Sequence, residues 1–430
     1  MSKTLTTDVL VIGGGPAGLA ASIAAKDAGA DVIVIEREQR LGGILKQCIH
    51  DGFGLVRFQE KLSGPEYAER FIDVFHEKQI PALLQTFVTE SKKTADGFET
   101  TVVDREGITT IFSKAMILAT GCRERSARQV SIHGTRPAGI YTAGTAQNFI
   151  NLMGQLPAKK CVILGSGDIG LIMARRLTLE GAEVVGVYEV KSTPSGLTRN
   201  IHQCLNDYGI PLHLSHTVTR VFGHDRLSAV EIAEVDDKMR PIDGTQQVVE
   251  CDALILSVGL IPENEIAEKL GVDLDWHTKG PLCDENLMTS VPGIFSCGNA
   301  LHVNDLVDYV SESGEIAGKG AASYAKNFGT ATTASPKNIP LEAGENTLYI
   351  VPQNIRLKDE PAEKTIVYFR SKEIFDRSVF KISDENGNVL FEKKYPFLRP
   401  PEMEKVLVDF GSFGLTAGSK LTATIEEVSA

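Results

Sequence analysis

The chain has 430 residues, of which 42% are hydrophobic and 23% are charged. This length predicts two or three domains and excludes a single small binding module, and the composition excludes a mainly disordered chain. The formal net charge of −12 disfavours nucleic acid and anionic membrane surfaces as partners.

The N-terminal segment and the cysteines favour a cytoplasmic location. Residues 1–8 lack the apolar core of a signal peptide, and no run approaches the roughly 20 apolar residues that span a bilayer. The cysteines are odd in number, scattered and never spaced as CxxC, which favours reduced thiols and argues against a structural zinc site. They are Cys48, Cys122, Cys161, Cys204, Cys251, Cys283 and Cys297. We therefore expect no bound metal and no direct insertion into a membrane.

Residues 8–36 have the pattern of a βαβ unit. An apolar strand runs into Gly13, Gly15 and Gly18, and an Ala-rich helix, a second apolar strand and Glu36 follow. Glycines at this spacing let a pyrophosphate approach the backbone N–H groups at the positive end of the helix, and the acid can accept hydrogen bonds from a ribose. This unit predicts an adenine-dinucleotide site.

The same pattern returns in residues 161–189. An apolar strand is followed by Gly165, Gly167 and Gly170, an amphipathic helix and a further strand. The repeat predicts a second dinucleotide site. The alternative is a duplicated fold that no longer binds a nucleotide.

The acid of the second unit is shifted by one position. Counted from the glycines, the position equivalent to Glu36 is Tyr188, and Glu189 follows it. An acid here favours NAD over NADP because it repels a 2′-phosphate, but Lys191 and Arg199 keep NADP open. We expect NAD(H) to be preferred over NADP(H).

The C-terminal part of the chain differs in composition from the rest. A helix is expected from about Ser313 to Asn327, and residues 330–340 form a Thr/Ala/Ser/Pro-rich linker. Beyond it, alternating patterns predict strands at residues 347–351, 365–370, 379–382, 389–393, 405–409 and 421–425. This region is expected to be a small β domain. It cannot supply a thiolate cage for an iron–sulfur cluster, because the last cysteine is Cys297.

Three further motifs follow one another along the chain. Residues 119–121 are Ala-Thr-Gly, residues 257–262 are Ser-Val-Gly-Leu-Ile-Pro, and residues 293–299 are Gly-Ile-Phe-Ser-Cys-Gly-Asn. Together with the two glycine turns, this order resembles the pyridine nucleotide-disulfide oxidoreductase superfamily, the flavoproteins with two dinucleotide-binding domains that include thioredoxin reductase. The resemblance covers about residues 5–328.

The resemblance implies an α/β fold with two Rossmann-like domains, in which an NAD(P) domain is inserted into a split FAD domain. A small C-terminal β domain follows. The expected boundaries are 1–130 and 280–329 for the FAD domain, 131–279 for the NAD(P) domain, 330–340 for the linker and 341–430 for the β domain.

The resemblance also implies which residues meet the cofactors. Gly42 and Gly43 would lie beside the pyrophosphate, the backbone of Val88 would meet the adenine, and Gly298 and Asn299 would face the ribityl chain. The family usually has Asp where Asn299 stands, and an amide can still hydrogen-bond a hydroxyl. The residues expected at FAD are Gly13, Gly15, Gly18, Glu36, Gly42, Gly43, Val88, Thr120, Gly121, Gly298 and Asn299, and those expected at NAD are Gly165, Gly167, Gly170 and Glu189.

Residues 41–54, 119–125 and 134–147 carry a narrower likeness. They resemble the FAD/NAD subunits of multicomponent dehydrogenases, namely the sarcosine oxidase alpha, opine oxidase and hydrogen cyanide synthase subunits. They are most similar to the flavoprotein that accompanies anaerobic glycerol-3-phosphate dehydrogenase. This likeness implies a dehydrogenase partner subunit that carries the substrate site and any iron–sulfur centre.

The segment after Gly43 contains the candidates for catalysis. Cys48 could be a charge-transfer donor or a peroxide-reactive thiol, or an inert packed cysteine. His50 could donate a proton to balance the charge of the reduced flavin, or belong to a surface turn. Lys46, or the N-terminus of the helix after Ser311, could stabilise negative charge on the flavin. Disulfide reduction is disfavoured because neither CxxC nor CxxxxC occurs.

These patterns predict an FAD-dependent oxidoreductase that transfers hydride between NAD(P)H and flavin N5. The protein would be the electron-transferring component of a multicomponent dehydrogenase of the glycerol-3-phosphate type. Two alternatives remain open: a free-standing NADH oxidase or peroxidase that uses Cys48, and an FAD-bearing scaffold subunit with a vestigial NAD domain.

Overall fold

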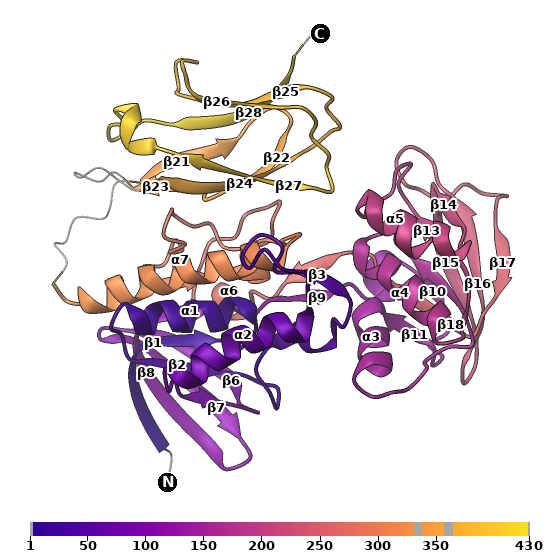
Figure 1. Ribbon diagram of the computed structural model, residues 1–430, viewed down its shortest axis with the longest axis horizontal. Coiled ribbons are helices and arrows are strands. Elements are labelled where there is room, and N and C mark those ends of the chain that lie inside the picture. Colours follow the sequence, from indigo (N-terminus) through magenta and orange to yellow (C-terminus); the bar gives the residue numbers. More distant parts are fainter. Residues whose placement is uncertain (1–2, 331–337, 357–363, 429–430) are drawn as a thin grey trace. The chain divides into compact units, whose positions relative to one another are not determined.

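The computed structural model of the protein describes residues 3–330, 338–356 and 364–428 (Figure 1). The chain forms two compact units, one assembled from Met1–Cys122 and Pro262–Ala430, the other from Arg123–Ile261. The chain passes from the first unit to the second in β9 (Cys122–Glu124) and back in β19 (Leu260–Pro262), and these two strands pair with each other. The domain boundaries that we expect at residues 130/131 and 279/280 stay predictions.

A seven-stranded sheet lies at the centre of the first unit. Its order is β5-β2-β1-β8-β7-β6, with β20 paired to β8. The strand β2 reads Val-Ile-Val-Ile and is buried along its whole length, as expected for a parallel strand covered on both faces. The strands are β1 (Lys3–Ile12), β2 (Val32–Ile35), β5 (Ala82–Leu83), β6 (Phe87–Thr94), β7 (Gly97–Asp104), β8 (Gly107–Leu118) and β20 (Ile294–Ser296); a separate hairpin pairs β3 (Asp51–Phe53) with β4 (Leu62–Ser63).

Helix α7 begins earlier than the sequence predicts. The helix spans Val307–Lys326, so the expected start near Ser313 is wrong. Leu306 precedes it and has no side-chain oxygen for an N-cap, so the usual sequence signal for a helix start is missing. The other helices of the first unit are α1 (Pro16–Asp27), α2 (Gly64–Glu77), α6 (Glu265–Lys269) and the 3₁₀ turns η1 (Gly43–Gln47) and η4 (Gly298–Ala300).

Helices α1 and α7 touch through their backbones. A Cβ placed on Gly314 would lie 2.3 Å from the carbonyl oxygen of Ala17, and one on Gly318 would lie 2.2 Å from that of Ala21. Only glycine at both positions permits this approach. The contact joins a helix from each of the two segments of the first unit, and thereby holds these segments together.

The second unit contains a five-stranded parallel sheet in the order β11-β18-β12-β13-β14. A second sheet has the order β10-β15-β16-β17. The strands of the first sheet are β11 (Ile140–Thr142), β12 (Lys160–Leu164), β13 (Glu183–Glu189), β14 (Leu212–Leu214) and β18 (Ala253–Leu256). Those of the second are β10 (His133–Gly134), β15 (His216–Gly223), β16 (Leu227–Glu234) and β17 (Gln247–Glu250). The helices are α3 (Ala143–Asn151), α4 (Asp168–Leu179), α5 (Thr198–Cys204), η2 (Ala127–Val130) and η3 (Asn206–Tyr208).

The C-terminal residues, for which the sequence predicts a small β domain, form two packed β-sheets. Their orders are β23-β21-β28-β25-β26 and β22-β24-β27. Phe369 and Phe380, one from each sheet, stack with ring centroids 4.0 Å apart in the core between them. The elements are β21 (Asn338–Ala343), β22 (Thr347–Val351), β23 (Asn354–Arg356), β24 (Thr365–Ser371), β25 (Ser378–Ser383), β26 (Val389–Tyr395), β27 (Met403–Val408), β28 (Leu421–Glu427) and η5 (Phe410–Phe413).

The linker predicted at residues 330–340 falls mostly on residues 331–337, which lie outside the described residues. Strand β21 begins at Asn338, before the expected end of the linker. The two Rossmann-like units with a small β domain confirm the predicted α/β fold class. Among the described residues, no helix is long and apolar enough to cross a membrane.

The β domain packs against the rest of the first unit. Tyr349 and Tyr368 from its smaller sheet join the hydrophobic core that contains α1 and α7. The ring of His302 lies 6.0 Å from the ring of Tyr349 and 5.3 Å from that of Tyr368, and the residue is 1% exposed. Burial, with the charge of Arg370 as a smaller cause, lowers the pKa of His302 to about 3.

Replacement of His302 should make the protein less sensitive to acid. The unfolded chain binds a proton at His302 below about pH 6.5, whereas the folded protein does not until about pH 3, so folding stability falls as the pH drops through this window. At pH 5 the loss from this residue is on the order of 2 kcal/mol. We expect His302→Leu to lose less unfolding free energy than the wild type between pH 7.5 and pH 5 in urea titrations. Equal losses in the two proteins would contradict a neutral buried His302.

Candidate functional site

The first glycine turn is shaped by close backbone contacts. Gly13 has a φ of +112°, and a Cβ on Gly18 would lie 1.8 Å from the carbonyl oxygen of Gly13. Gly15 stands at the N-cap of α1, where it has no side chain to cover the positive end of the helix. Larger side chains at Gly13 or Gly18 would force the turn apart.

Gly42 and Gly43 bring a second backbone segment to the same turn. The N–H of Gly42 donates to the carbonyl of Gly14 at 2.8 Å, and a Cβ on Gly43 would lie 2.9 Å from the Cα of Gly15. Because two glycines face each other here, the start of α1 stays accessible to an anion. These residues fit a dinucleotide pyrophosphate.

Glu36 closes the turn from the end of β2. One carboxylate oxygen accepts a hydrogen bond from Gly14 N at 2.8 Å, and the other accepts one from Glu38 N at 2.8 Å. The residue is 7% exposed, so these bonds compensate for the burial of its charge. Each carboxylate oxygen has a second lone pair that can accept a bond from a ribose hydroxyl.

Three further FAD candidates lie in or just after other strands of the same sheet: Thr120 and Gly121 follow β8, and Val88 lies in β6. Thr120 donates its hydroxyl to the carbonyl of Glu263 at 2.7 Å, so its side chain is used to join the two segments of the unit. Gly121 has a φ of +70°, a conformation that glycine adopts without strain. Val88 lies in β6 opposite Val102, and its side chain packs against the hydrophobic core on that face of the sheet.

Gly298 and Asn299 belong to a short turn that is tied to α7. The N–H of Gly298 donates to the hydroxyl of Ser313 at 2.9 Å. The side-chain oxygen of Asn299 accepts a bond from Asn304 N at 3.0 Å, and its amide nitrogen donates to the sulfur of Cys122 at 3.6 Å. The sequence did not predict these roles of Asn304 and Ser313. A loop separates Asn304 from Asn299, and the first turns of α7 also separate Ser313 from Gly298.

The candidates for catalysis lie on η1 or just after it, and each makes a close contact within this region. Lys46 Nζ donates to the carbonyl of Arg40 at 2.7 Å, and burial lowers the pKa of Lys46 although nearby glutamates oppose the shift. Cys48 donates to the carbonyl of Ile44 at 3.4 Å. The ring of His50 is 5.0 Å from the ring of Phe53.

Burial raises the pKa of the Cys48 thiol to about 12. A thiol with this pKa is almost entirely protonated at neutral pH, and the thiolate is the reactive form. The raised pKa, together with the bond to Ile44, therefore favours the packed cysteine over a peroxide-reactive one.

The second glycine turn repeats the first. Gly165 has a φ of +97°, and a Cβ on Gly170 would lie 2.7 Å from the carbonyl oxygen of Gly165. Gly167 stands at the N-cap of α4, as Gly15 does on α1. The N–H of Gly170 donates to the hydroxyl of Ser257, which comes from the Ser-Val-Gly motif.

Glu189, and not Tyr188, occupies the place of Glu36. Its carboxylate accepts bonds from Ser166 N at 3.0 Å and from Lys191 N at 3.1 Å, the counterparts of the bonds from Gly14 and Glu38. The hydroxyl of Ser166 adds a third bond at 2.5 Å. The expected equivalence with Tyr188 is therefore wrong.

A bulge explains the difference. Cys161 on β12 pairs with Val184, but the next residue, Val162, pairs with Gly186, so β13 contains one extra residue. The extra residue shifts the sequence count by one, yet the acid still ends at the turn. Tyr188 instead stacks on His213 at 4.6 Å. The one-residue shift of the acid therefore no longer supports the hypothesis that the second site is vestigial.

Asp168 is a further residue of the second turn that sequence reasoning missed. It is the first residue of α4, and its carboxylate accepts bonds from Leu197 N at 2.8 Å and from the side chain of Asn200 at 2.7 Å. An acid in the first helical turn was the available signal. Asp168 holds residues 195–200 against the start of the helix, close to the glycines.

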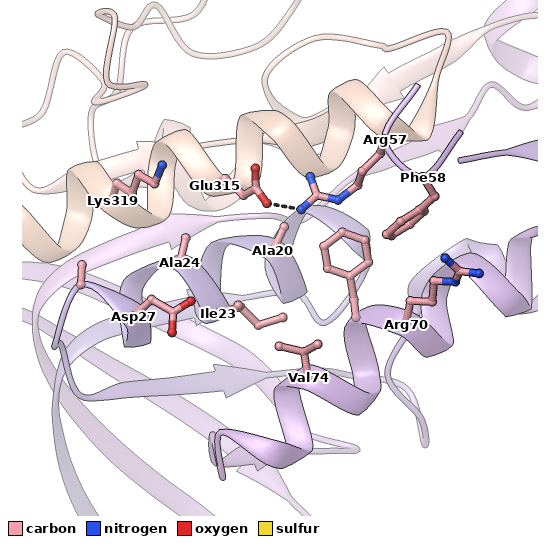
Figure 2. A pocket seen from close by; sticks show the side chains of 12 residues that line it. Ala20, Ile23, Ala24, Asp27, Arg57, Phe58, Arg70, Val74, Glu315 and Lys319 are labelled. Carbon is pink, nitrogen blue, oxygen red and sulfur yellow. Dashed lines mark hydrogen bonds and ion pairs between the residues drawn. The ribbon is translucent and has the colours of Figure 1, made fainter. Parts of the chain in front are cut away.

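A groove on the first unit lies apart from these residues. Figure 2 shows it between α1, α2 and α7, with Phe58 and Val74 in its wall and the ion pair of Arg57 with Glu315 at its edge. Its volume is about 580 Å³, and none of the predicted site residues lines it. The part of the chain that the structure describes also contains no cluster of three or more His, Cys, Asp or Glu side chains suited to a metal.

Two glycine turns, each closed by a buried glutamate, place the chain among the proteins with two Rossmann-like units. Residues 7–335 match the pyridine nucleotide-disulphide oxidoreductase family, and the chain belongs to this family. Members bind FAD and NAD(P) and are oxidoreductases. The resemblance that the ordered motifs predicted is confirmed.

Particular relatives are components of larger enzymes. The chain is 27% identical to the hydrogen cyanide synthase subunit HcnB of Pseudomonas protegens over 65% of its own length and 62% of the relative. It is 24% identical to one of the opine oxidase subunits of Agrobacterium tumefaciens over 73% of its length and 64% of that relative. The match to the alpha subunit of sarcosine oxidase from Corynebacterium is 27% identical and covers 69% of this chain and 31% of the relative. The chain thus spans less than two thirds of each of these proteins.

Solved structures of thioredoxin reductases share the fold. The enzyme of T. acidophilum superposes with a TM-score of 0.60 at 22% identity, covering 74% of this chain and 98% of that one. The enzyme of Lactococcus lactis gives 0.62 at 18% identity, covering 75% and 99%. About a quarter of this chain has no counterpart in either structure.

The half-buried Cys48 thiol should react slowly with alkylating agents. Its raised pKa, from 9.0 to about 12, reduces the thiolate fraction about a thousand-fold at neutral pH. We expect iodoacetamide at pH 7.5 to leave Cys48 unmodified in the folded protein and to label it after unfolding in urea, as read from the Cys48 peptide by mass spectrometry. Rapid labelling of the folded protein would instead indicate a reactive thiolate.

Proposed function

We propose that this protein is an FAD-dependent oxidoreductase subunit that transfers hydride between NAD(P)H and FAD and passes electrons to a partner dehydrogenase subunit. The observation that carries the proposal is the repeated carboxylate closure. Glu36 holds Gly14 in the first unit, and Glu189 holds Ser166 in the second. The two carboxylates stand at equivalent places beside the glycine turns, where each could also accept a bond from a ribose hydroxyl.

The first unit would bind FAD through backbone and side-chain groups already in position. Gly15 and Gly43 would admit the pyrophosphate to the start of α1, and Glu36 would accept bonds from the ribose. FAD, when bound, supplies the two-electron chemistry, which the side chains alone lack. The FAD-contact residues proposed are Gly13, Gly15, Gly18, Glu36, Gly42, Gly43, Val88, Thr120, Gly121, Gly298 and Asn299.

Charge on the reduced flavin would be balanced by groups beside it. The N-terminus of α7 at Val307 offers uncapped N–H groups and a positive dipole end, and Lys46 offers a cation. His50 is the candidate proton donor. Cys48 is proposed to be a packing residue, because its thiol stays protonated.

The second unit would bind NAD(H) in preference to NADP(H). Glu189 would accept bonds from the adenosine ribose and repel a 2′-phosphate. Lys191 and Arg199 follow Glu189 and could attract a 2′-phosphate. The backbone N–H of Lys191, however, donates to the Glu189 carboxylate and so helps to hold this negative charge at the turn. Gly165, Gly167 and Gly170 would bring the backbone to the pyrophosphate.

A partner subunit would carry the substrate. The names of the relatives describe subunits of hydrogen cyanide synthase, opine oxidase and sarcosine oxidase. The residues between Leu41 and Gly54 favour a partner of the glycerol-3-phosphate dehydrogenase type with its own iron–sulfur centre. The seven cysteines of this chain are scattered and never spaced as CxxC, which supports a reducing compartment such as the cytoplasm.

Anaerobic reduction of the bound flavin tests the proposal. The protein should purify with an oxidised-flavin absorbance band that NADH bleaches faster than NADPH does. A flavin-bearing protein that neither nucleotide bleaches would contradict hydride transfer through the second unit. A protein that neither retains nor rebinds FAD would contradict the proposal altogether.

Three glutamate variants separate the two sites. Glu36→Gln should weaken FAD binding by roughly 10- to 150-fold, because a hydrogen bond to a charged group contributes on the order of 1.5–3 kcal/mol. Glu189→Gln should leave FAD bound and reduce the preference for NADH by a similar factor, measured as the ratio of bleaching rates. Glu180→Gln, at the opposite end of α4, is the matched control and should change neither quantity. An unchanged nucleotide ratio in Glu189→Gln would argue against this role of Glu189.

A further inference from the structure

We propose that the β domain of residues 338–428 is a positioning element of the flavin site. In this proposal Arg370 acts through Asp305 on the segment that joins Asn299 to the start of α7. The inference rests on the proposed binding of FAD to the first unit, and it assigns Arg370 a role in the retention and redox potential of the flavin. Arg370 itself does not touch the reacting atoms.

Arg370 uses its whole guanidinium at the contact between the β domain and this segment. Nη2 lies 2.6 Å from a carboxylate oxygen of Asp305, and Nε donates to the hydroxyl of Tyr349 at 3.2 Å. Nη1 donates to the carbonyls of Pro400 and Pro401. The side chain is only 14% exposed. The planar fork of arginine satisfies these partners together, which the single ammonium of lysine cannot do.

Asp305 is held by the β domain at both of its oxygens. The second oxygen accepts a bond from the backbone N–H of Met403, the first residue of β27, at 2.5 Å. Asp305 follows Asn304, whose N–H donates to the side chain of Asn299. The segment 299–305 is therefore held by its own bond between Asn304 and Asn299 and by the bonds of Asp305 to the β domain. Helix α7 begins two residues after this segment.

A second contact fixes α7 itself. Glu312 on α7 accepts a bond from the hydroxyl of Tyr368 at 2.5 Å and forms an ion pair with Lys405 at 2.6 Å. His302, inside the segment, packs against the rings of Tyr349 and Tyr368. The β domain thus contacts both the segment 299–305 and the helix that follows it.

These contacts also set the charge at the start of α7. Asp308, in the first turn of the helix, accepts a bond from the backbone N–H of Arg57 at 2.8 Å, and Asp305 is neutralised by Arg370. Without Arg370, the Asp305 carboxylate would be left as an uncompensated negative charge near the positive end of the helix. Since reduced flavin carries more negative charge than oxidised flavin, this change should disfavour reduction.

The experiment uses the full-length holoprotein and measures FAD affinity and the flavin midpoint potential. Arg370→Met should raise the FAD dissociation constant by about tenfold, because residues in a packed network alter ligand binding on the order of 2- to 30-fold. It should also make the midpoint potential more negative. A tenfold loss of preference for the reduced flavin corresponds to about 30 mV for a two-electron couple.

Asp305→Asn gives the opposite test of charge and nearly conserves volume. It removes the carboxylate and leaves Arg370 uncompensated, so the potential should become more positive, while FAD affinity again falls. General loosening of the fold does not predict shifts of opposite sign in two variants that break the same ion pair. This variant also keeps the proposal testable if Arg370→Met does not fold.

Arg399→Met is the matched control. Arg399 pairs with Asp376 at 2.7 Å and donates to Phe375 and Leu398, all within the β domain and without contact to the segment 299–305. This variant should retain wild-type FAD affinity and potential. The proposal is overturned if Arg370→Met and Asp305→Asn match this control, or if both shift the potential in the same direction. Failure of the wild-type chain itself to bind FAD would overturn the proposed function instead, so the two failures are distinguishable.

Discussion

Each glycine turn of this protein depends on a buried carboxylate that accepts hydrogen bonds from backbone N–H groups. An ionised carboxylate in a buried position is costly unless it is bonded, so Glu36 and Glu189 must find these partners for the turns to close. The bonds place the end of one strand against the turn that leaves its neighbour. The glycines then supply conformations and close approaches that other residues cannot adopt. The carboxylate and the glycines are thus one structural unit, and the candidate ligand sites follow from it.

The first unit depends equally on contacts between distant parts of the chain. Gly314 and Gly318 allow α7 to lie on the backbone of α1, and Thr120 joins its strand to Glu263. The β domain continues this pattern, because Arg370 pairs with Asp305, just before α7, and Lys405 pairs with Glu312 in the helix. Cations from a domain that follows α7 in the sequence thus hold both the helix and the segment that leads into it.

The sequence predicted the fold class and most of the strands, because local patterns determine them. Strand β2 is a continuous apolar run, and the alternation in the C-terminal region is strong. The place of Glu189 could not be obtained by counting, because a bulge at β13 adds a residue without moving the end of the strand. The start of α7 was missed because Leu306 cannot act as a side-chain cap. The pairing of Arg370 with Asp305 joins residues 65 positions apart and leaves no local pattern.

The contact of α1 with α7 has a consequence for the order in which the protein matures on the ribosome. Gly314 and Gly318 are made almost three hundred residues after helix α1. At a synthesis rate of about 5–20 residues per second, the N-terminal strand and helix wait on the order of 15 to 60 seconds for the partner that covers them. Residues 123–261 are synthesised as one uninterrupted stretch and can fold during this interval. The inserted unit would then be complete while the Ala-rich face of α1 is still exposed, so this apolar face stays open to wrong contacts until α7 covers it.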